Sequence, residues 1–471
     1  MQSKHNIFIK TEELLADLLT PVGVYSNLRD QFKNPLLLES ADFHDRSDSK
    51  SFICLEPLAG FESKGRYCEI EIGSDRKVLQ FEKQQQVFEQ FKSFFDSFEF
   101  NLQKDSITTA GFFGYSSFES VQYFEDLNFK TAQSKLKDNP DMKYQLFRFV
   151  LVFDHFKNTL TIVEHALDAP IESNQSISDL KQFIYNSSNH PFNFETFGTE
   201  TSGLEDEDFL EMVEKGVTHC QRGDVFQVVF SRSFKQGFRG DEFNVYRALR
   251  SLNPSPYLFY FDYGDFRIFG SSPEAQLQVN QQESTLNPIA GTIRRTGDTK
   301  KDAVLATELL KDPKERSEHV MLVDLARNDL SKNCNNVEVS NFSEVQYFSH
   351  VIHLVSKVKG QFKPGTSPLD IYADTFPAGT LSGAPKFRAI QIIKEQEQEN
   401  RSFYGGAIGF LGFDGTVNKA IIIRSVLSKH NQLIYQAGAG VVVDSKPVNE
   451  LNEVHNKLAA IRSAIQKACE L

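Results

Sequence analysis

Hydrophobic and polar residues recur with two different periods along the chain, and these periods predict its secondary structure. Apolar residues spaced three or four apart predict helices at 87–98, 205–223, 313–330 and 447–468. Alternating or short apolar runs predict strands, which include 34–40, 51–60, 224–234, 267–279, 353–362, 407–428 and 432–443. The segment 144–165 predicts a β-hairpin that turns at 155–158.

Several of the predicted strands form hairpins rather than strand–helix–strand crossovers, which favours a largely antiparallel α+β fold. Residues 166–209 are polar and rich in Pro, Ser, Asn and Gly, so they predict a linker, part of which is compatible with a short helix. We therefore expect two domains, comprising residues 1–200 and 201–471.

Composition excludes several classes of function. The chain has 471 residues and a net charge of −12, which argues against a nucleic-acid or anionic-membrane partner. No apolar run approaches the roughly 20 residues that span a bilayer, and the first residues lack a signal-peptide pattern. The 5 cysteines are scattered without a CxxC or Cys/His cluster, and no phosphate-binding glycine loop occurs. These features predict a cytoplasmic protein without a membrane or nucleic-acid partner.

The helix at 313–330 begins with two acidic residues. Asp312 is a favourable N-cap, Pro313 suits the first helical position, and Glu315 stands where a capping-box partner would lie. Glu315 and Glu318 are three residues apart, so both carboxylates lie on one side of the helix. The stripe behind them is expected to be buried and consists of Val320, Met321, Leu322, Leu325 and Ala326.

The helix at 447–468 repeats this arrangement, with Pro447 near its start and Glu450 and Glu453 three residues apart. Acidic residues also favour helix N-termini by about 0.3–1 kcal/mol each, which is the simpler explanation for either pair alone. Two such pairs favour a hard cation between them. Mg²⁺ prefers oxygen ligands and leaves positions for water and an anionic ligand.

Three further features favour an anionic ligand. Gly438, Ala439 and Gly440 are expected just after a strand, where small residues let backbone N–H groups approach a carboxylate. The loop 376–386 is expected to end near a helix N-terminus, although an ordinary helix-entry turn explains it equally well. Arg424, in the otherwise apolar strand predicted around it, requires an anionic partner if it is buried.

Six motifs identify a resemblance. In chain order they are PIAGTIRR, LLKDPKERSEHVMLVDLARNDL, FPAGTLSGAPK, YGGAIGF, QAGAGVVVDS and ELNEVHNK. This ordered set covers roughly residues 205–465 and resembles the chorismate-utilising enzymes. LLLES and NPSPYLFYF are similar to the tryptophan-site segments of the anthranilate synthase component I branch. The resemblance implies a layered α/β/β/α sandwich with largely antiparallel sheets.

The resemblance also implies a site. Glu318 and Glu453 would ligate Mg²⁺ bound to the ring carboxylate of chorismate, with Glu315 and Glu450 completing the acidic pocket. The implied chorismate-binding residues are Gly291, Thr292, Tyr404, Arg424, Gly438, Ala439, Gly440 and Lys457.

The implied chemistry is attack of ammonia on ring C2, departure of the C4 hydroxyl and elimination of pyruvate. Glu274 matches the general acid, and His353 matches a histidine implicated in the reaction, with Thr380 beside it. A satisfied core histidine is the alternative reading of His353.

Two positions in the sequence distinguish the chorismate-utilising enzymes by the nucleophile that they use. Some aminodeoxychorismate synthases carry a nucleophilic lysine at the position of Ala290, and alanine forms no covalent adduct. Isochorismate and salicylate synthases carry a lysine base for water at the position of Gln227, and a neutral amide cannot deprotonate water usefully. Both positions favour ammonia as the nucleophile and therefore anthranilate synthase.

The chain has no glutaminase nucleophile motif, so the resemblance implies ammonia from a separate glutamine amidotransferase subunit or from free ammonium. L-Tryptophan is the implied inhibitor, and its expected site comprises Glu39, Ser40, Pro256, Tyr257 and Leu258. Two alternatives stay open. One is an aminodeoxychorismate synthase that lacks the lysine, and the other is a non-catalytic tryptophan-binding regulatory module.

Overall fold

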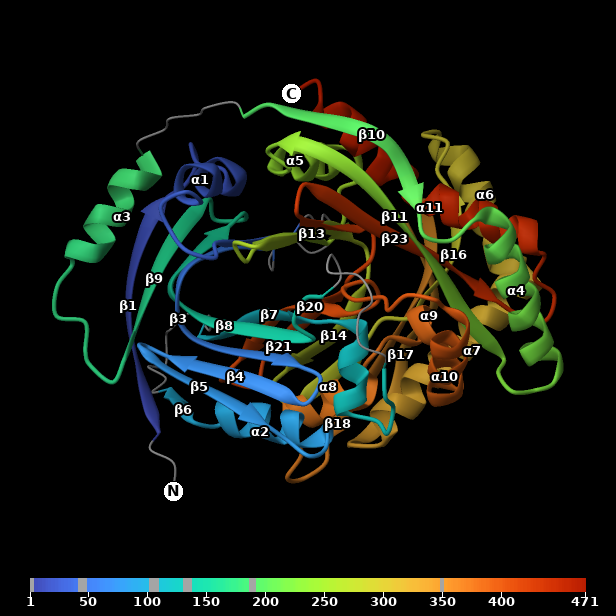
Figure 1. Ribbon diagram of the computed structural model, residues 1–471, viewed down its shortest axis with the longest axis horizontal. Coiled ribbons are helices and arrows are strands. Elements are labelled where there is room, and N and C mark those ends of the chain that lie inside the picture. The colour runs from blue at the N-terminus through green and yellow to red at the C-terminus, as the bar shows by residue number, and fades with distance from the viewer. Residues whose placement is uncertain (1–3, 41–48, 101–109, 130–137, 186–191, 348–350) are drawn as a thin grey trace.

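The computed structural model describes residues 4–40, 49–100, 110–129, 138–185, 192–347 and 351–471 (Figure 1). The helices are α1 (Pro21–Leu28), α2 (Gln85–Phe95), η2 (Phe118–Tyr123), α3 (Gln175–Tyr185), α4 (Asp206–Gln221), α5 (Phe243–Leu252), α6 (Thr299–Lys311), α7 (Pro313–Ser331), α8 (Pro368–Thr375), α9 (Gly379–Ser382), α10 (Lys386–Gln396) and α11 (Pro447–Ala468). The strands of the first half are β1 (His5–Leu15), β2 (Leu36–Glu39), β3 (Lys50–Lys64), β4 (Tyr67–Ile72), β5 (Asp75–Gln80), β6 (Phe98–Phe100), β7 (Gly111–Ser116), β8 (Met142–Asp154), β9 (Thr159–Leu167) and β10 (Phe194–Ser202). Those of the second half are β11 (Gln227–Gly240), β12 (Tyr257–Asp262), β13 (Phe266–Ser272), β14 (Ala275–Asn280), β15 (Glu283–Leu286), β16 (Ile289–Arg294), β17 (Cys334–Tyr347), β18 (Val351–Phe362), β19 (Gly383–Ala384), β20 (Ala407–Gly412), β21 (Val417–Ile421), β22 (Ser425–Lys429) and β23 (Gln432–Val441).

The ladders confirm the antiparallel α+β fold. Among the described strands, β1 with β6 is the single parallel pair, and every other pair is antiparallel. The predicted hairpin at 144–165 is confirmed, because Asp154 ends β8 opposite Thr159 at the start of β9. Local alternation and a short turn were enough to define this unit.

Two ladders join strands that are far apart in the sequence. Strand β2 pairs with β12, and β7 pairs with β20. The expected boundary near residue 200 falls within β10, which pairs with β11. The division into domains 1–200 and 201–471 stays a prediction.

Strand β11 lies at the centre of the second half. It pairs with β10, β19 and β23, and it runs beside β23 along most of its length (Figure 1). Helix α11 packs against β23, α4 and α5. Its apolar side chains Val454, Leu458, Ile461 and Ile465 are buried, so the C-terminal helix covers this part of the sheet.

Helix α7 begins as predicted but buries a different face. The side chain of Asp312 accepts a hydrogen bond from the backbone N–H of Glu315 at 3.1 Å, so it caps the helix. The fully buried apolar side chains are Val323, Ala326 and Leu330, together with His319. Val320 is 51% exposed, which corrects the predicted stripe, because this side chain points about 100° away from His319 around the helix. Glu315, one turn before His319 on the same side of the helix, is partly buried.

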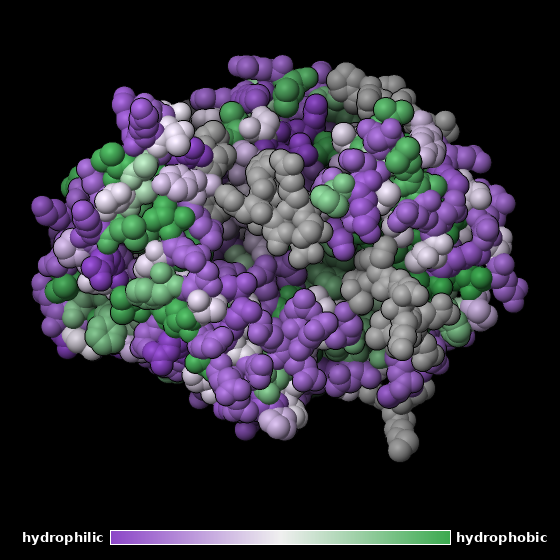
Figure 2. Space-filling view, turned by 180° about the vertical axis from the view of Figure 1, so that it is seen from behind, coloured by the Kyte–Doolittle hydropathy of each residue, from purple (hydrophilic) through white to green (hydrophobic). Residues whose placement is uncertain are grey.

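No helix in the described part of the chain is long and apolar enough to cross a membrane. The face opposite to the view of Figure 1 is mostly hydrophilic, with hydrophobic residues in separate patches (Figure 2). Small separate patches of this kind are ordinary on folded proteins.

Candidate active site

The ladder between β11 and β23 brings two predicted segments together. Gly438 lies opposite Ser231 and Gly440 opposite Val229. These glycines therefore lie within β23 rather than after a strand, which corrects the sequence prediction. A Cβ on Gly440 would collide with the amide nitrogen of Gln227. The sheet thus needs a glycine at 440 for Gln227 to occupy its position.

Lys457 and Tyr404 meet at the same strand. Lys457 Nζ donates to the carbonyl oxygen of Gly438 at 2.9 Å and pairs with Glu453 at 2.6 Å. The hydroxyl of Tyr404 bonds with the backbone of Gly438, and burial raises the pKa of this hydroxyl. Four of the predicted substrate-binding and metal residues therefore form one connected group.

Glu274 lies between β13 and β14 at the centre of the candidate site. Thr380 Oγ1 donates to its carboxylate at 2.9 Å. Burial raises the pKa of Glu274 to about 7, against the opposing effects of the Thr380 hydrogen bond and the charges of Lys457 and Arg424. A carboxyl group that holds its proton near neutral pH is suited to general acid catalysis.

Arg424 stands between two strands rather than within one. Strand β21 ends at Ile421 and β22 begins at Ser425, and Arg424 adopts a left-handed backbone conformation with φ of 50°. This break corrects the continuous strand predicted from the apolar sequence. Burial lowers the pKa of Arg424 while the charge of Glu274 opposes that shift. Such uncommon backbone conformations concentrate at functional sites.

His353 is buried in β18 beside the β16 segment. Its Nδ1 donates to the carbonyl oxygen of Gly291 at 2.9 Å, since a carbonyl can only accept. Burial lowers the pKa of His353, and the charge of Arg424 lowers it further. The ring is therefore neutral near pH 7, with Nε2 as its acceptor nitrogen. The backbone of Thr292 pairs with that of His353, and the side chain of Thr292 lies outside the described atoms.

The acidic pairs approach the same region from two helices. Gly291 has φ of 65°, and a Cβ there would lie 3.2 Å from Glu315 Oε2. Glu450 is buried in the first turn of α11, while the side chain of Glu453 is 46% exposed. Within the described residues, no group of three or more His, Cys, Asp or Glu side chains is arranged to hold a metal ion. The four glutamates therefore do not form a complete protein cage.

The expected tryptophan site forms a separate cluster. Leu258 of β12 lies opposite Glu39 of β2, so the two distant segments are neighbours. Glu39 is buried and accepts hydrogen bonds from Tyr246 at 2.6 Å and Arg250 at 2.8 Å. The hydroxyl of Tyr257 accepts from Gln278. Pro256 lies directly before β12, and Ser40 lies directly after β2.

Sequence reasoning missed Tyr246, Arg250 and Arg401. Tyr246 and Arg250 are four residues apart on α5, so one helix face presents both, but this spacing does not indicate a contact with residue 39. Arg401 bonds with residues from three other segments. In the sequence its one signal is a basic residue beside the apolar pair Phe403 and Tyr404.

The chain belongs to the chorismate binding enzyme family, and the match to this family covers residues 49–463. It is 36% identical over 468 residues to anthranilate synthase component 1 of Neisseria gonorrhoeae, covering 98% of this chain and 95% of that protein. It is 34% identical to the protein of the same name from Aquifex aeolicus, covering 100% and 97%. The crystal structure of anthranilate synthase component I from Streptococcus pneumoniae aligns with a TM-score of 0.77 at 31% identity, over 96% of this chain and 99% of that one. These similarities confirm the family and the fold inferred from the motifs.

We predict that Glu274→Gln makes the protein less active but more stable above pH 7. The loss of a proton donor should lower the rate of chorismate consumption by about 10²–10⁴-fold. Because the folded-state pKa lies above the unfolded value, the wild type loses stability as the pH rises from about 4.5 through about 7, and the amide avoids this loss. Thermal unfolding of both proteins at pH 5 and pH 8, with initial rates of chorismate consumption at the same pH values, tests this.

Glu242→Gln provides the matched control. Burial also raises the pKa of Glu242, which pairs with Arg267 away from the candidate site. Its replacement should leave the rate within about twofold of wild type. An unchanged rate in Glu274→Gln would contradict the general-acid assignment.

Proposed function

We propose that the chain converts chorismate and ammonia to anthranilate and pyruvate, as the large subunit of an anthranilate synthase. The observation that carries this proposal is Glu274, whose carboxyl group accepts a hydrogen bond from Thr380 and has a pKa that burial raises to about 7 against the charges of Lys457 and Arg424. Such a group can donate a proton inside a pocket that attracts an anion. The relatives named anthranilate synthase component 1 support the choice of reaction.

Binding rests on the two cations and the strand between them. Arg424 and Lys457 would bind the carboxylates of the dianionic substrate, and the small residues of β23 let the ring approach the backbone. Arg424 would regain in this complex the anionic partner that its burial requires.

Proton transfers follow from the protonation states of Glu274 and His353. Glu274 would donate its proton to the C4 hydroxyl as that group leaves the ring. The neutral ring of His353 would then accept a proton at Nε2 during pyruvate elimination.

Gln227 supports ammonia as the nucleophile. Its Oε1 is buried without a hydrogen-bond partner among the described residues, and an unsatisfied buried acceptor is costly. Ammonia carries N–H donors that would satisfy this oxygen beside ring C2. The chain would receive ammonia from a glutaminase subunit, which the word "component" in the relatives' names supports, or from free ammonium.

The four glutamates fit an Mg²⁺ ion that takes only a few of its ligands from the protein. Mg²⁺ commonly takes one or two carboxylates and fills its remaining positions with water and substrate oxygens. Glu318 and Glu453 would supply the direct ligands, while Glu315 and Glu450 hold charge nearby. When bound, the ion would neutralise the ring carboxylate of chorismate and fix its orientation.

The product assay tests the reaction and the metal together. Purified protein with chorismate, MgCl₂ and ammonium at mildly alkaline pH should yield anthranilate and pyruvate in equal amounts, resolved by mass. EDTA should abolish both products, and added MgCl₂ should restore them. Aminodeoxychorismate without pyruvate, or isochorismate, would contradict the proposal, as would full activity in EDTA.

We also propose that L-tryptophan inhibits the enzyme at the cluster around Glu39. This buried carboxylate lies opposite Leu258 and is held by Tyr246 and Arg250, so it offers a charged partner for an amino group beside an apolar side chain. Tryptophan should lower the rate, and Glu39→Gln should raise the concentration for half-inhibition by at least about tenfold, because a charge-assisted hydrogen bond is lost.

Glu164→Gln is the matched control for tryptophan inhibition. Glu164 is also buried and is held by Arg148 at 3.0 Å and by Ser176 at 2.6 Å, but it lies outside the cluster. This variant should keep the wild-type response. An equal rate with and without tryptophan in the wild type would remove the assignment.

A further inference from the structure

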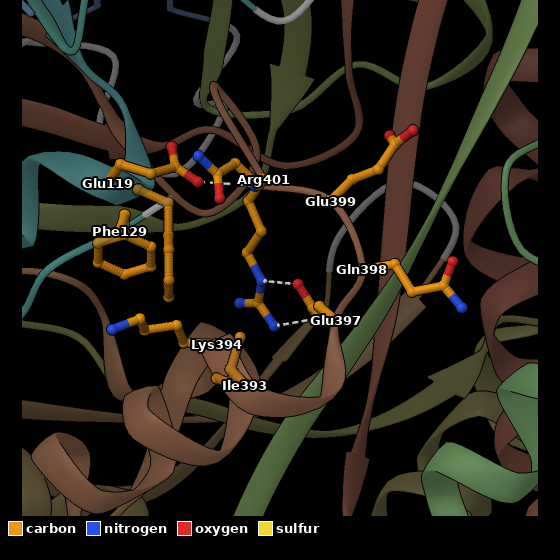
Figure 3. Close-up of a pocket in the computed structure, with 10 residues that line it drawn as sticks. Glu119, Phe129, Ile393, Lys394, Glu397, Gln398, Glu399 and Arg401 are labelled. Atoms are coloured by element: carbon orange, nitrogen blue, oxygen red, sulfur yellow. Dashed lines mark hydrogen bonds and ion pairs between the residues drawn. The ribbon is translucent and has the colours of Figure 1, made fainter. Parts of the chain in front are cut away.

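The guanidinium of Arg401 is buried behind the candidate active site. Its side chain is 1% exposed, and that of its partner Glu397 is 6% exposed. The two groups are joined twice, through Nε at 2.9 Å and an Nη at 2.6 Å, and Figure 3 shows them pointing at each other. This two-point geometry fixes the plane of the guanidinium.

The remaining guanidinium N–H groups bind backbone carbonyls of two site segments. One Nη donates to Leu381 O at 2.6 Å, and the other donates to Val229 O at 2.6 Å. Leu381 directly follows Thr380, the donor to Glu274. Val229 lies two residues after Gln227 and opposite Gly440. One side chain therefore connects the segment carrying Thr380 with the strand carrying Gln227.

Glu397 holds β11 at a second residue, Ser231. Its Oε1 accepts from the backbone N–H and the hydroxyl of Ser231, at 2.9 and 2.8 Å. Ser231 lies opposite Gly438, whose carbonyl oxygen holds Lys457. The ion pair thus connects the segment that carries Thr380 with the part of β11 that carries Gln227 and pairs with β23.

Two aromatic rings lie beside the guanidinium, and a second carboxylate holds the backbone of Arg401. Its central carbon lies 4.5 Å from the ring centre of Phe118 and 5.9 Å from that of Tyr404. The backbone N–H of Arg401 donates to Glu119 at 2.7 Å. The cavity beside the pair, in part lined by Phe129 and Lys394, has a volume of about 20 Å³, which is enough for roughly one water molecule. The position of the Arg401 guanidinium is therefore defined by packing as well as by charge.

We infer that Arg401, held by Glu397, is a positioning residue for the chorismate reaction, which sets the placement of Thr380, Gln227 and Tyr404 around Glu274. The inference rests on the proposed function, because it concerns the same site. A lysine at 401 keeps the charge but cannot bind a carboxylate at two points and two carbonyls at once. Displacements of about 1 Å in reacting groups can cost about 10²-fold in rate.

Arg401→Lys tests the inference with steady-state kinetics on the full chain. The kcat with ammonium should fall by at least about 20-fold, while KM for chorismate changes by less than about threefold, because reacting groups move more than the binding cations do. The pH at which kcat/KM declines should also rise, because Thr380 no longer lowers the pKa of Glu274. Thr380→Val should move this pH in the same direction.

Arg29→Lys is the matched control. Arg29 also binds a carboxylate at two points, that of Asp241, and its guanidinium lies 4.9 Å from the ring centre of Phe243. It lies outside the candidate active site, so its replacement should lower the unfolding temperature and leave kcat and the pH profile unchanged. If Arg401→Lys behaves like Arg29→Lys, the positioning role is overturned.

Glu397→Gln keeps the test decisive if Arg401→Lys fails to fold. Glutamine retains an acceptor for Ser231 but loses one of the two charged contacts to Arg401, so the same fall in kcat and the same pH shift are expected. Wild-type kinetics in a folded Glu397→Gln would overturn the inference. A wild type that makes no anthranilate would instead refute the proposed function, independently of these variants.

Discussion

The candidate site depends on the close antiparallel pairing of β11 with β23. This ladder places Ser231 opposite Gly438 and Val229 opposite Gly440, and so sets the relative positions of Gln227, Tyr404 and Lys457. A shift of one residue would turn each side chain to the other face of the sheet. The glycines keep this register compatible with side chains that approach the strand closely.

The burial of charged side chains is the second constraint, and its cost is partly offset between neighbouring groups of opposite charge. Burial raises the pKa of Glu274 and lowers that of Arg424, and each group partly offsets the shift of the other. A folded state that keeps the Glu274 carboxyl partly protonated near pH 7 gives up stability for reactivity. The Arg401–Glu397 pair is the opposite case, because its charged groups are joined at two points within the protein. Glu274 and Arg424 are thus available to a ligand, whereas Arg401 and Glu397 hold segments of the site together.

Much of the fold followed from local sequence. The cap at Asp312, the hairpin at 144–165 and the stripe of α11 depend on residues within a few turns of one another. The errors arose where tertiary packing decides the outcome. Val320 is exposed because the sheet contacts the neighbouring face of α7. Arg424 breaks an apolar run by adopting a left-handed backbone conformation, and the charge of Glu274 acts on its pKa from a distant segment.

The site residues followed from ordered motifs, and the structure brings together Glu274, Thr380, Arg424, Lys457 and Tyr404. Tyr246, Arg250 and Arg401 were missed because their partners lie far away in the sequence, on segments that meet only after folding. Periodicity reports which face of an element is buried, but it does not report which distant group that face contacts.

A crystal structure of the protein with chorismate and Mg²⁺ tests the central claim most directly. The account predicts the ring beside Glu274 and Gln227, its carboxylates on Arg424 and Lys457, and Mg²⁺ about 2.0–2.1 Å from oxygens of Glu318 and Glu453. Chorismate bound elsewhere, or in this pocket with Glu274 turned away from the C4 hydroxyl, would contradict it.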